Sequence, residues 1–363
     1  MTHDTYTLLI YLGFFFLAGI FAFLVNGLFL QFASNLGMRN TDDHTIRWSS
    51  TTKPAVGGVS FFILFLLSIA CYSIFFEQNK FLYNHKFLGF LAASILGFLI
   101  GLADDAYNTK PLLKFSGQLT CAILLVISGN KIVFFGIEFL DVSLTIFWVI
   151  GLMNSINMLD NMDGITTTVS ICIILSALFM LLYRNDIYNP DFILLESVLC
   201  ALVSFLFFNW HPSKMYMGDT GSQFLGVFLA AIGINYFWMG HEVDGYRTQT
   251  KQFIEPLLIF IIPIIDTTIV TINRLKRGQS PFVGGKDHTT HHLSYMGLSD
   301  RQVALTFFGL SFISLISLML IEFFIKNWGY TQLIVFFIYF LGLFGTMFYI
   351  THKFKQPLQP KSK

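Results

Sequence analysis

The stretch TIFWVIGLM-NSINMLDNMDGI-TTTVSICIILSALFM, residues 145–180, decides how this chain folds. Its two ends are apolar runs of the kind that lie in hydrocarbon. Between them, the segment from Asn154 to Ile165 contains three asparagines and two aspartates. The stretch therefore predicts two membrane-spanning helices joined by a polar turn. It also raises the question of why amides and carboxylates are concentrated at that turn.

Composition extends this prediction to the whole chain. The 363 residues are 55% hydrophobic and 12% charged, whereas a typical soluble domain carries roughly 25% charge. A helix needs about 20 mostly apolar residues to cross a bilayer, and such blocks recur. They predict an all-α, polytopic membrane protein of about 11 transmembrane helices, with residues 1–363 as a single integral-membrane domain. The predicted spans are Thr7–Ala33, Gly57–Phe76, Phe87–Leu102, Leu112–Ser128, Ser143–Met153, Thr166–Tyr183, Phe192–Phe208, Ser222–Met239, Phe253–Ile272, Val303–Ile325 and Gln332–Ile350.

The loops predict the orientation. The first block exceeds the roughly 7–15 residues of a signal-peptide core and its leader has no Lys or Arg, so we expect a retained helix. If the spans alternate, 15 of the 22 Lys and Arg residues fall on one side and 7 on the other. Positively charged loops face the cytoplasm. We therefore expect a multi-pass protein of the cell (inner) membrane with its N-terminus outside and its C-terminus in the cytoplasm.

Charge and cysteine usage exclude other classes. The net charge of +1 leaves no basic footprint for nucleic acid. The four cysteines fall within apolar runs, which indicates small buried hydrophobic residues rather than disulfides or metal ligands. These residues are Cys71, Cys121, Cys172 and Cys200.

Polar residues gather in five clusters, all on the predicted cytoplasmic side. This arrangement indicates one site assembled from several helix ends. The clusters are KPAVGG (53–58), GLADDAYNTKPLLKFSGQ (101–118), NSINMLDNMDG (154–164), FNWHPSKMYMGDTGSQFLG (208–226) and GGKDHTTHHLSYMGLSDRQV (284–303).

The adjacent carboxylates Asp104 and Asp105 end one predicted span. Such a pair is either a solvated marker of the membrane boundary or a functional pair, because a divalent cation or a proton-accepting role gives a reason to hold like charges together. Lys114 and Gln118, four residues apart, share a face of the next helix. Lys114 is placed either to bind a phosphate or to extend its ammonium to the interface.

In the opening stretch, Asn154, Asn157, Asp160 and Asp163 recur every three residues. On an ideal helix this step drifts by about 60° per repeat, so the four side chains spread over half a turn. A helix end that loosens near Gly164 would let them converge. Carboxylate and carboxamide oxygens are hard ligands suited to Mg²⁺. The alternative is an ordinary polar loop between two spans.

Asp219 lies between Gly218 and Gly221, directly before a long apolar run. Glycines followed by a helix N-terminus make a suitable phosphate site, but an aspartate there repels phosphate unless a cation lies between them. Asp219 is therefore the strongest single candidate for a metal ligand. Capping of the helix by Asp219 or Thr220 is compatible with that role.

Three histidines, His288, His291 and His292, lie within five residues. They are suited either to bind a transition metal or to donate hydrogen bonds to an anionic diphosphate. The basic loop before them, residues 273–286, is suited to anionic lipid headgroups or to a charged substrate.

Taken in order over about Pro54 to Val303, the five clusters resemble the polyprenyl-phosphate N-acetylhexosamine-1-phosphate transferases (glycosyltransferase family 4). This resemblance implies transfer of a sugar 1-phosphate, most simply N-acetylglucosamine 1-phosphate, from a UDP-N-acetylhexosamine to undecaprenyl phosphate, with release of UMP. It implies Mg²⁺ as cofactor, with Mn²⁺ as an alternative, and an active site on the cytoplasmic face of the lipid bilayer. A homodimer is an alternative to a monomer.

The resemblance also assigns site residues. Four aspartates correspond to catalytic or nucleotide-contacting positions: Asp104, Asp105, Asp160 and Asp163. Two residues correspond to the Mg²⁺ ligands: Asn157 and Asp219. Substrate binding is expected of Lys53, Lys114, Asn154, Asn209, His288, His291 and His292. Attack of one phosphate on another brings anions together, so catalysis must consist mostly of positioning and charge neutralisation. We expect Asp104 or Asp105 to deprotonate or orient the lipid phosphate.

The chain departs from the family pattern in three places. The usual D-G-x-D-G reads D-N-M-D-G, with Asn161 in place of a glycine. The histidine loop reads D-H-T-T-H-H rather than H-x-H-H or H-H-H. Upstream, IRWSSTTKPAVGG lacks the usual R-K-x-H. The absent H-H-H favours a simple UDP-N-acetylhexosamine donor over the phospho-MurNAc-pentapeptide translocases.

Other classes fit the sequence less well. A phospho-MurNAc-pentapeptide translocase-like enzyme is the first alternative. A secondary transporter is the alternative from a different class, but transporters place polar groups near the bilayer midplane and usually show repeats. Intramembrane prenyltransferases need a D-D-x-x-D repeat, and CDP-alcohol phosphatidyltransferases continue their D-G motif into A-R. This chain has neither.

Overall fold

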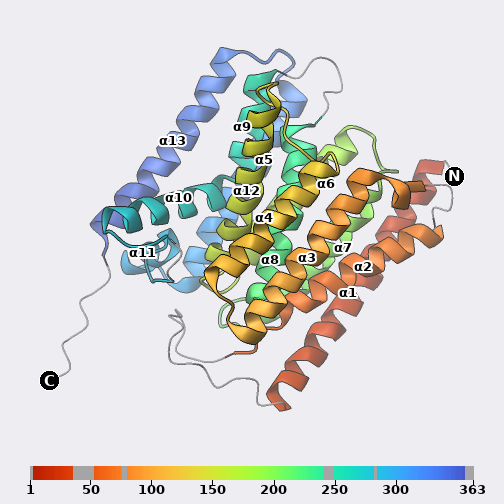
Figure 1. Ribbon diagram of the computed structural model, residues 1–363, viewed down its shortest axis with the longest axis horizontal. Coiled ribbons are helices and arrows are strands. Elements are labelled where there is room, and N and C mark those ends of the chain that lie inside the picture. The colour runs from red at the N-terminus through yellow and green to blue at the C-terminus, as the bar shows by residue number, and fades with distance from the viewer. Residues whose placement is uncertain (1–2, 36–52, 76–79, 241–247, 282–283, 356–363) are drawn as a thin grey trace.

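The computed structural model describes residues 3–35, 53–75, 80–240, 248–281 and 284–355. Within these ranges it is a bundle of helices (Figure 1). The elements are α1 (His3–Asn35), α2 (Gly57–Phe75), η1 (Lys80–Tyr83), α3 (His85–Tyr107), α4 (Pro111–Ile127), α5 (Glu138–Leu159), α6 (Ile165–Tyr183), α7 (Pro190–Asn209), α8 (Gly218–Ile232), η2 (Gly233–Trp238), α9 (Gln249–Ile259), α10 (Ile261–Lys276), α11 (Thr289–Tyr295), α12 (Asp300–Phe324) and α13 (Tyr330–Lys353).

The helices confirm the prediction of an all-α, polytopic membrane protein. Nine of them, among the described residues, are long and apolar enough to cross a membrane. A tenth span exists if α9 and α10 are counted as one, and α4 is a shorter apolar helix of 17 residues. Among the described residues, each of the eleven predicted blocks is therefore helical over most of its length. The orientation of the termini stays a prediction. Part of the Lys and Arg count on which it rests lies outside the described residues, namely Arg39, Arg47, Arg247, Lys361 and Lys363. The departure from the family pattern before residue 53 also lies outside them.

The block predicted as one span over 253–272 is two helices. α9 and α10 meet at an angle of 77°. Pro256 lies inside α9 and Pro263 lies in the first turn of α10. Proline lacks a backbone donor and clashes with the preceding turn, so two prolines on either side of the break favour a bend. The bend directs α10 across the bundle toward α11 (Figure 1).

α8 is the central helix of the bundle. In the most apolar stretch of α8 and η2, 94% of the residues are buried, compared with 6% in α13. α8 contacts α2, α3, α5 and α6. Glycines permit the closest approaches: an ideal Cβ on Gly58 would lie 2.1 Å from the backbone nitrogen of Gly221, and one on Gly101 would lie 2.1 Å from the carbonyl oxygen of Asp219. Small residues let membrane helices pack backbone to backbone in this way.

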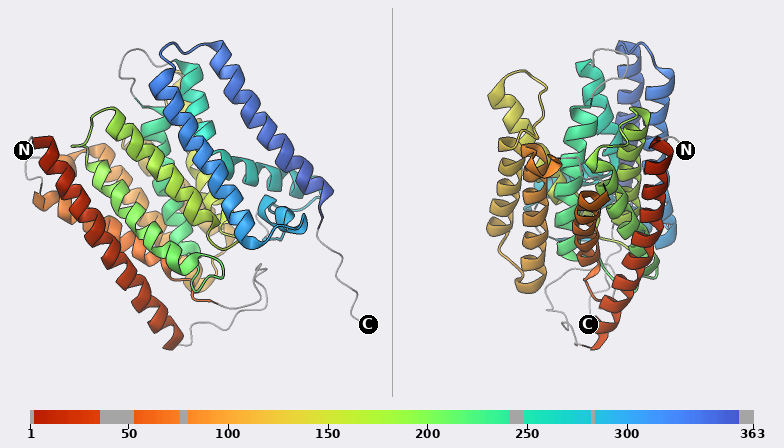
Figure 2. Two further views of the ribbon diagram at one scale, coloured as in Figure 1. Left: turned by 180° about the vertical axis from the view of Figure 1, so that it is seen from behind. Right: turned by 90° about the vertical axis from the view of Figure 1, so that its right-hand side faces the viewer.

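The peripheral helices present apolar side chains outward. α1 lies at one edge of the bundle and α13 at the opposite edge (Figure 2). Leu17 of α1 and Ile338 of α13 are 70% and 62% exposed. A surface of this kind is costly in water and is suited to lipid.

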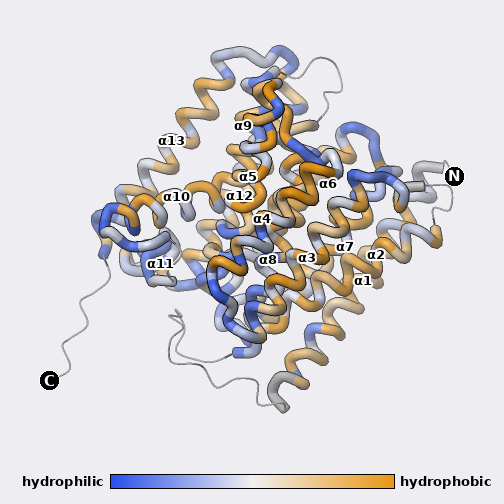
Figure 3. The backbone as a smooth tube through the Cα atoms, in the orientation of Figure 1, coloured by the Kyte–Doolittle hydropathy of each residue, from blue (hydrophilic) through white to orange (hydrophobic). Residues whose placement is uncertain are grey.

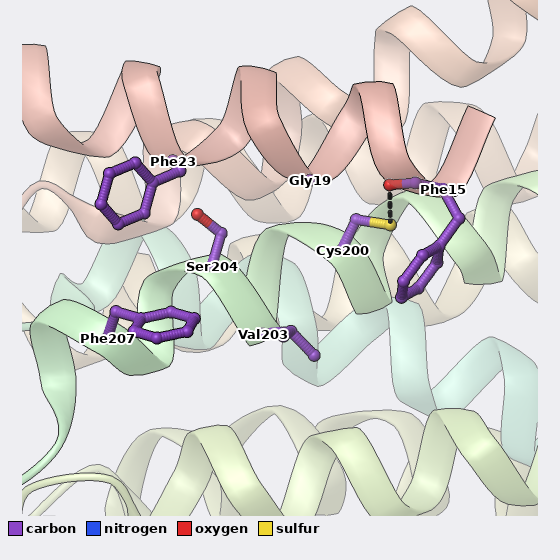
Figure 4. Close-up of a pocket in the computed structure, with 7 residues that line it drawn as sticks. All are labelled: Phe15, Gly19, Phe23, Cys200, Val203, Ser204 and Phe207. Carbon is purple, nitrogen blue, oxygen red and sulfur yellow. Dashed lines mark hydrogen bonds between the residues drawn. The ribbon is translucent and has the colours of Figure 1, made fainter. Parts of the chain in front are cut away.

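α1 and α7 enclose a small apolar groove (Figure 4). The Cys200 thiol donates a hydrogen bond to the carbonyl oxygen of Phe15 across it, at 3.4 Å. The groove contains no residue of the five polar clusters, so it is separate from the candidate site. All four cysteines are free, and three of them are buried, as the sequence predicts. The groove is lined by Phe15, Gly19, Phe23, Cys200, Val203, Ser204 and Phe207.

The up-and-down course of the chain brings polar helix ends to one end of the bundle. α3 ends there and α4 begins, α5 ends and α6 begins, and α7 ends before α8 begins. Hydrophilic residues lie along the chain near the starts of α4 and α8 (Figure 3). A parallel bridge between Ala55 and Tyr216 joins the segment before α2 to the segment before α8.

Candidate active site

Lys114 lies at the centre of the site, where α3, α4, α5 and α8 meet. α4 begins with Pro111 at its first position, which places Lys114 in the first turn of the helix. The Lys114 ammonium donates hydrogen bonds to Asp104 Oδ2 at 2.8 Å and Asp219 Oδ2 at 2.9 Å, and to Asn157 Oδ1 at 3.4 Å. Each of the three acceptors comes from a different helix. The structure thus brings four of the predicted site residues together.

Asn157 and Asp219, the predicted metal ligands, are in direct contact. The Asn157 amide donates to Asp219 Oδ1 at 2.6 Å and to Ser222 Oγ at 2.8 Å. Asp219 lies in the first turn of α8, directly after Gly218, whose φ is +76°. That conformation favours glycine, and an ideal Cβ there would lie 2.8 Å from the Ala55 carbonyl oxygen.

Asp104 and Asp105 have separate partners. Asp104 accepts hydrogen bonds from the Thr109 backbone and hydroxyl at 2.8 and 2.5 Å, and from Lys114. Asp105 accepts from the backbone N–H groups of Asp219 and Thr220 at 2.9 and 2.8 Å, and from the Thr220 hydroxyl at 2.6 Å. Asp105 therefore caps the N-terminus of α8 from a neighbouring helix. Asp104, by contrast, shares a counter-ion with Asp219.

Asn154 lies one turn deeper, in a layer of amides. Its Nδ2 donates to Gln118 Oε1 at 2.8 Å, and Gln118 Nε2 donates to Gln223 Oε1 at 3.0 Å. Gln118 and Gln223 are buried. The predicted shared face of Lys114 and Gln118 on α4 is thus confirmed: Lys114 reaches the site and Gln118 supports the helices beneath it.

Asp163 belongs to a second polar group. It accepts hydrogen bonds from the Ser213 backbone and hydroxyl at 3.0 and 2.8 Å, and it pairs with His211 Nδ1 at 3.1 Å. Lys53 approaches Asp163 to 3.8 Å and donates to Ser213 Oγ at 2.9 Å. The same imidazole lies 3.7 Å from Asp300 at the start of α12. Asp163 therefore connects the first, third and fourth polar clusters directly, and the fifth by way of His211.

The other two predicted residues in these turns have different surroundings. Asn209 is buried: its Oδ1 accepts from the Gly164 backbone at 3.1 Å and from Thr167 Oγ1 at 2.8 Å, and its Nδ2 donates to the Met215 carbonyl at 3.1 Å. This network holds two turns together and gives Asn209 a supporting position. Asp160 is half-buried and forms the C-cap of α5.

The expected convergence of the four regularly spaced residues is wrong. α5 does end at Leu159, and Gly164 has a φ of +76°, so the helix loosens where the sequence predicts. However, Asn154 binds Gln118, Asn157 binds Asp219, and Asp163 binds Ser213. The side chains serve different partners because the step of three residues rotates them around α5 before the turn redirects the chain.

The histidine loop is anchored by Asp266 of α10. The buried Asp266 carboxylate pairs with His288 Nδ1 at 2.9 Å and accepts from the Thr289 backbone and hydroxyl at 2.8 and 2.6 Å. His291 Nδ1 accepts from the His288 backbone at 3.4 Å. His292 Nδ1 faces the Phe354 carbonyl oxygen.

The histidine loop contacts the turn between α5 and α6 directly. The Thr290 hydroxyl donates a hydrogen bond to Asn161 Oδ1 at 2.7 Å, and Asn161 Nδ2 donates to the Met158 carbonyl at 2.9 Å. These contacts join two of the positions at which the chain departs from the family pattern. Arg301 Nε also donates to the His211 carbonyl at 3.2 Å, so all five polar clusters meet at one end of the bundle.

Burial and neighbouring charges shift the pKa values of two residues of the loop. Burial raises the pKa of Asp287, but hydrogen bonds and charge from Arg274, together with Arg277, outweigh it and lower that pKa to about 2. Arg274 is buried and binds both Asp287 oxygens. Burial, followed by the charge of His288, lowers the pKa of His291 to about 3. His291 is therefore neutral at physiological pH.

Several residues of this site are not predicted from the sequence. Asp266 lies inside an apolar run, next to two threonines and no other ionisable residue that would mark it, and His211 and Ser213 are typical of a loop. The available signal for Asp266 is that an ionisable residue within a membrane block needs a partner. His288 and Thr289 supply that partnership from more than twenty residues away.

The donor chemistry around Lys114 fits a hard divalent cation. Two carboxylate oxygens and one amide oxygen face its ammonium, so the position favours positive charge. Oxygen ligands of this kind suit Mg²⁺ or Mn²⁺. In the part of the chain that the structure describes, no group of three or more His, Cys, Asp and Glu side chains has the geometry of a metal site. An ion at this position would therefore depend on Asn157 and on oxygens from water or substrate.

Comparison with known families places these motifs in context. A family model described as glycosyl transferase family 4 matches residues 87–237. The match runs from the first turn of α3 to the end of η2, short of their outermost residues, and so includes Asp104, Lys114, Asn157 and Asp219.

Three relatives illustrate the similarity. The probable undecaprenyl-phosphate N-acetylglucosaminyl 1-phosphate transferase of Bacillus subtilis is 29% identical over 74% of this chain and 73% of its own length. The decaprenyl-phosphate N-acetylglucosaminephosphotransferase of Mycobacterium tuberculosis is 27% identical over 79% and 76%. The undecaprenyl-phosphate alpha-N-acetylglucosaminyl 1-phosphate transferase of Escherichia coli K12 is 26% identical over 69% and 67%.

Proposed function

Because this chain belongs to glycosyl transferase family 4, we propose that it transfers N-acetylglucosamine 1-phosphate from UDP-N-acetylglucosamine to undecaprenyl phosphate and releases UMP. The chain is a phosphoglycosyl transferase, and its acceptor is a polyprenyl phosphate. The names of its relatives favour N-acetylglucosamine over the phospho-MurNAc-pentapeptide alternative. They also favour a transferase over a secondary transporter.

The observation that carries this proposal is the convergence of Asp104, Asn157 and Asp219 on one ammonium. Attack of a lipid phosphate on a diphosphate brings two anions together, so the enzyme must supply positive charge and position. Lys114 supplies one positive charge. We assign Mg²⁺, or Mn²⁺ in its place, to Asn157 and Asp219. When bound, this ion neutralises charge on the donor diphosphate.

The remaining site residues have roles that follow from their positions. Asp104 is placed to orient or deprotonate the lipid phosphate, whereas Asp105 holds the start of α8. Lys53 and Asp163 order the segment before α2 and the loop before α8. His288 and His291 belong to a loop that reaches the same end of the bundle, which suits contact with an anionic donor.

We place this end of the bundle at the cytoplasmic face of the inner membrane, because most Lys and Arg residues fall in the loops on that side. The product of the reaction, a lipid-linked sugar diphosphate, is suited to start the synthesis of a cell-envelope polysaccharide. We propose a monomer, with a homodimer as the alternative.

Release of UMP by the purified protein tests the proposal. The protein is incubated with undecaprenyl phosphate and, in separate reactions, UDP-N-acetylglucosamine, UDP-N-acetylgalactosamine or UDP-MurNAc-pentapeptide. We expect UMP with the first donor, its loss with EDTA and recovery with Mg²⁺. We expect a decrease of about 100-fold or more for Asp219→Ala. Release of UMP from the pentapeptide donor alone would overturn the assigned donor, and full activity of Asp219→Ala would overturn the metal assignment.

A further inference from the structure

Lys114 occupies the position that a divalent cation would need. Its ammonium lies within 2.9 Å of one oxygen of Asp104 and one of Asp219, and within 3.4 Å of the Asn157 amide oxygen. The Lys114 side chain is only 17% exposed. Asn157 and Asp219, the two residues assigned to Mg²⁺, are thus both engaged by a cation that belongs to the chain itself.

An ammonium and a metal ion exclude each other at such a position. Both need the same oxygen lone pairs, and a unit charge and a divalent charge at such short range repel each other strongly at the effective dielectric of a protein surface. Without any cation, two carboxylates directed at one point would repel each other in the same way. The ammonium is therefore stabilising when the metal is absent and competes with the metal when it is present.

We propose that Lys114 is a built-in counter-ion that occupies the metal position until a divalent ion displaces its ammonium, and that the displaced ammonium then binds an oxygen of the donor diphosphate. This proposal rests on the metal assignment made above. Lysine suits this role because its ammonium is a compact charge on a flexible four-carbon stem. The contact with Asp104, which is not a proposed metal ligand, keeps the displaced ammonium at the edge of the site.

The proposal predicts that metal and donor bind cooperatively. A divalent ion alone must displace the ammonium, so it binds weakly. The same ion together with a diphosphate binds more tightly, because the displaced ammonium gains an anionic partner. This coupling is reciprocal, as any linkage between two ligands must be. It also delays assembly of the charged site until the donor arrives.

Binding of Mn²⁺ to the purified protein, followed by electron paramagnetic resonance without any nucleotide, tests the proposal. We expect Lys114→Met to bind Mn²⁺ about tenfold more tightly than the unmodified protein. Lys110→Met is the matched control, because Lys110 is an exposed lysine next to the same helix start. It removes the same charge without the contacts. Addition of UDP should tighten Mn²⁺ binding in the unmodified protein by more than in Lys114→Met.

The outcomes separate this inference from the metal assignment. If Lys114→Met and Lys110→Met bind Mn²⁺ equally, Lys114 is not a competitor and the inference fails, while the metal assignment stands. If Asp219→Asn binds Mn²⁺ as tightly as the unmodified protein, the metal assignment itself fails.

A second measurement uses the unmodified protein and so does not depend on the folding of a variant. Reductive methylation of Lys114, read by mass spectrometry, should be several-fold faster with Mn²⁺ than without it, because the ammonium has left Asp219 and Asn157 and keeps only its contact with Asp104. Added UDP should slow it again. An unchanged rate in all three conditions would overturn the displacement.

Discussion

Asp105 shows how a single carboxylate serves the fold at the edge of the site. Both of its oxygens accept hydrogen bonds from the start of α8. A helix N-terminus has unsatisfied N–H groups and a partial positive charge, so a carboxylate there is favourable. Its neighbour Asp104 instead binds Thr109 and Lys114. Two adjacent aspartates that look equivalent in the sequence therefore do different work.

Replacement of Asp105 tests this difference. Asp105→Ala leaves three donors of α8 without their acceptor, so we expect a loss of about 2 kcal/mol in the free energy of unfolding. Thermal unfolding in detergent measures this loss. A variant that keeps its unfolding temperature but loses all activity would contradict the capping role and would support direct action of Asp105 on the substrate.

Neutral His291 makes the stability of the protein depend on pH. Its pKa is lowered to about 3 in the fold, compared with about 6.5 in an unfolded chain. Between these values the unfolded state binds more protons, so the free energy of unfolding rises with pH there. As the pH falls below about 6.5, this residue alone should remove about 1.4 kcal/mol per pH unit.

The unfolding temperature in detergent, measured between pH 7.5 and pH 5, tests this dependence. His291→Gln should flatten the decrease. His352→Gln, which changes an exposed histidine of α13, should leave the decrease unchanged. Identical pH profiles for all three proteins would show that His291 does not set the dependence.

At the scale of elements, the contact between Asn161 and Thr290 couples two turns. Asn161 follows the end of α5, and Thr290 lies in the first turn of α11. Their hydrogen bond of 2.7 Å positions the histidine loop against the turn that carries Asp160 and Asp163. The usual family motif has a glycine in place of Asn161, so this contact is a feature of the present chain.

A double-mutant cycle measures the coupling. Asn161→Gly and Thr290→Val should each raise KM for the UDP-sugar several-fold. The KM of the double variant should be no higher than that of the more impaired single variant, because both changes remove the same interaction. Thr290→Ser keeps the hydroxyl and should retain the unmodified KM. Additive effects of the two single changes would show that the residues act independently.

The sequence predicts elements better than it predicts contacts between them. Apolar blocks of spanning length indicate helices because a bilayer requires backbone groups to be satisfied within each segment. The proximity of Asn157 and Asp219 is predicted by the resemblance to the family, in which both correspond to metal ligands. The bond between Asp105 and Thr220 depends on the rotation of α3 and α8 about their axes, and the 77° bend after α9 is favoured by the prolines beside the break rather than by the pattern of apolar residues. Neither is encoded in local periodicity.

At the scale of the whole molecule, the orientation in the membrane is open to direct measurement. We expect Arg277→Cys, at the end of α10, to react with a membrane-impermeant maleimide only when the cytoplasmic side is accessible. Glu138→Cys, at the start of α5, should react in intact cells. The basis is the excess of Lys and Arg on one side. Labelling of Arg277→Cys in intact cells, with Glu138→Cys protected, would reverse the orientation.

The position of α8 has a consequence for how this enzyme can change. Its 15 residues carry Asp219 at one end and fill the interior along the rest of their length. Gly221 and Gly226 have no room for a side chain against α2 and α5. Selection for turnover and selection for a tightly packed interior therefore fall on the same short segment. New sugar preferences are consequently expected to arise in the loops and in α11, where a substitution can reshape the proposed donor site without displacing α8.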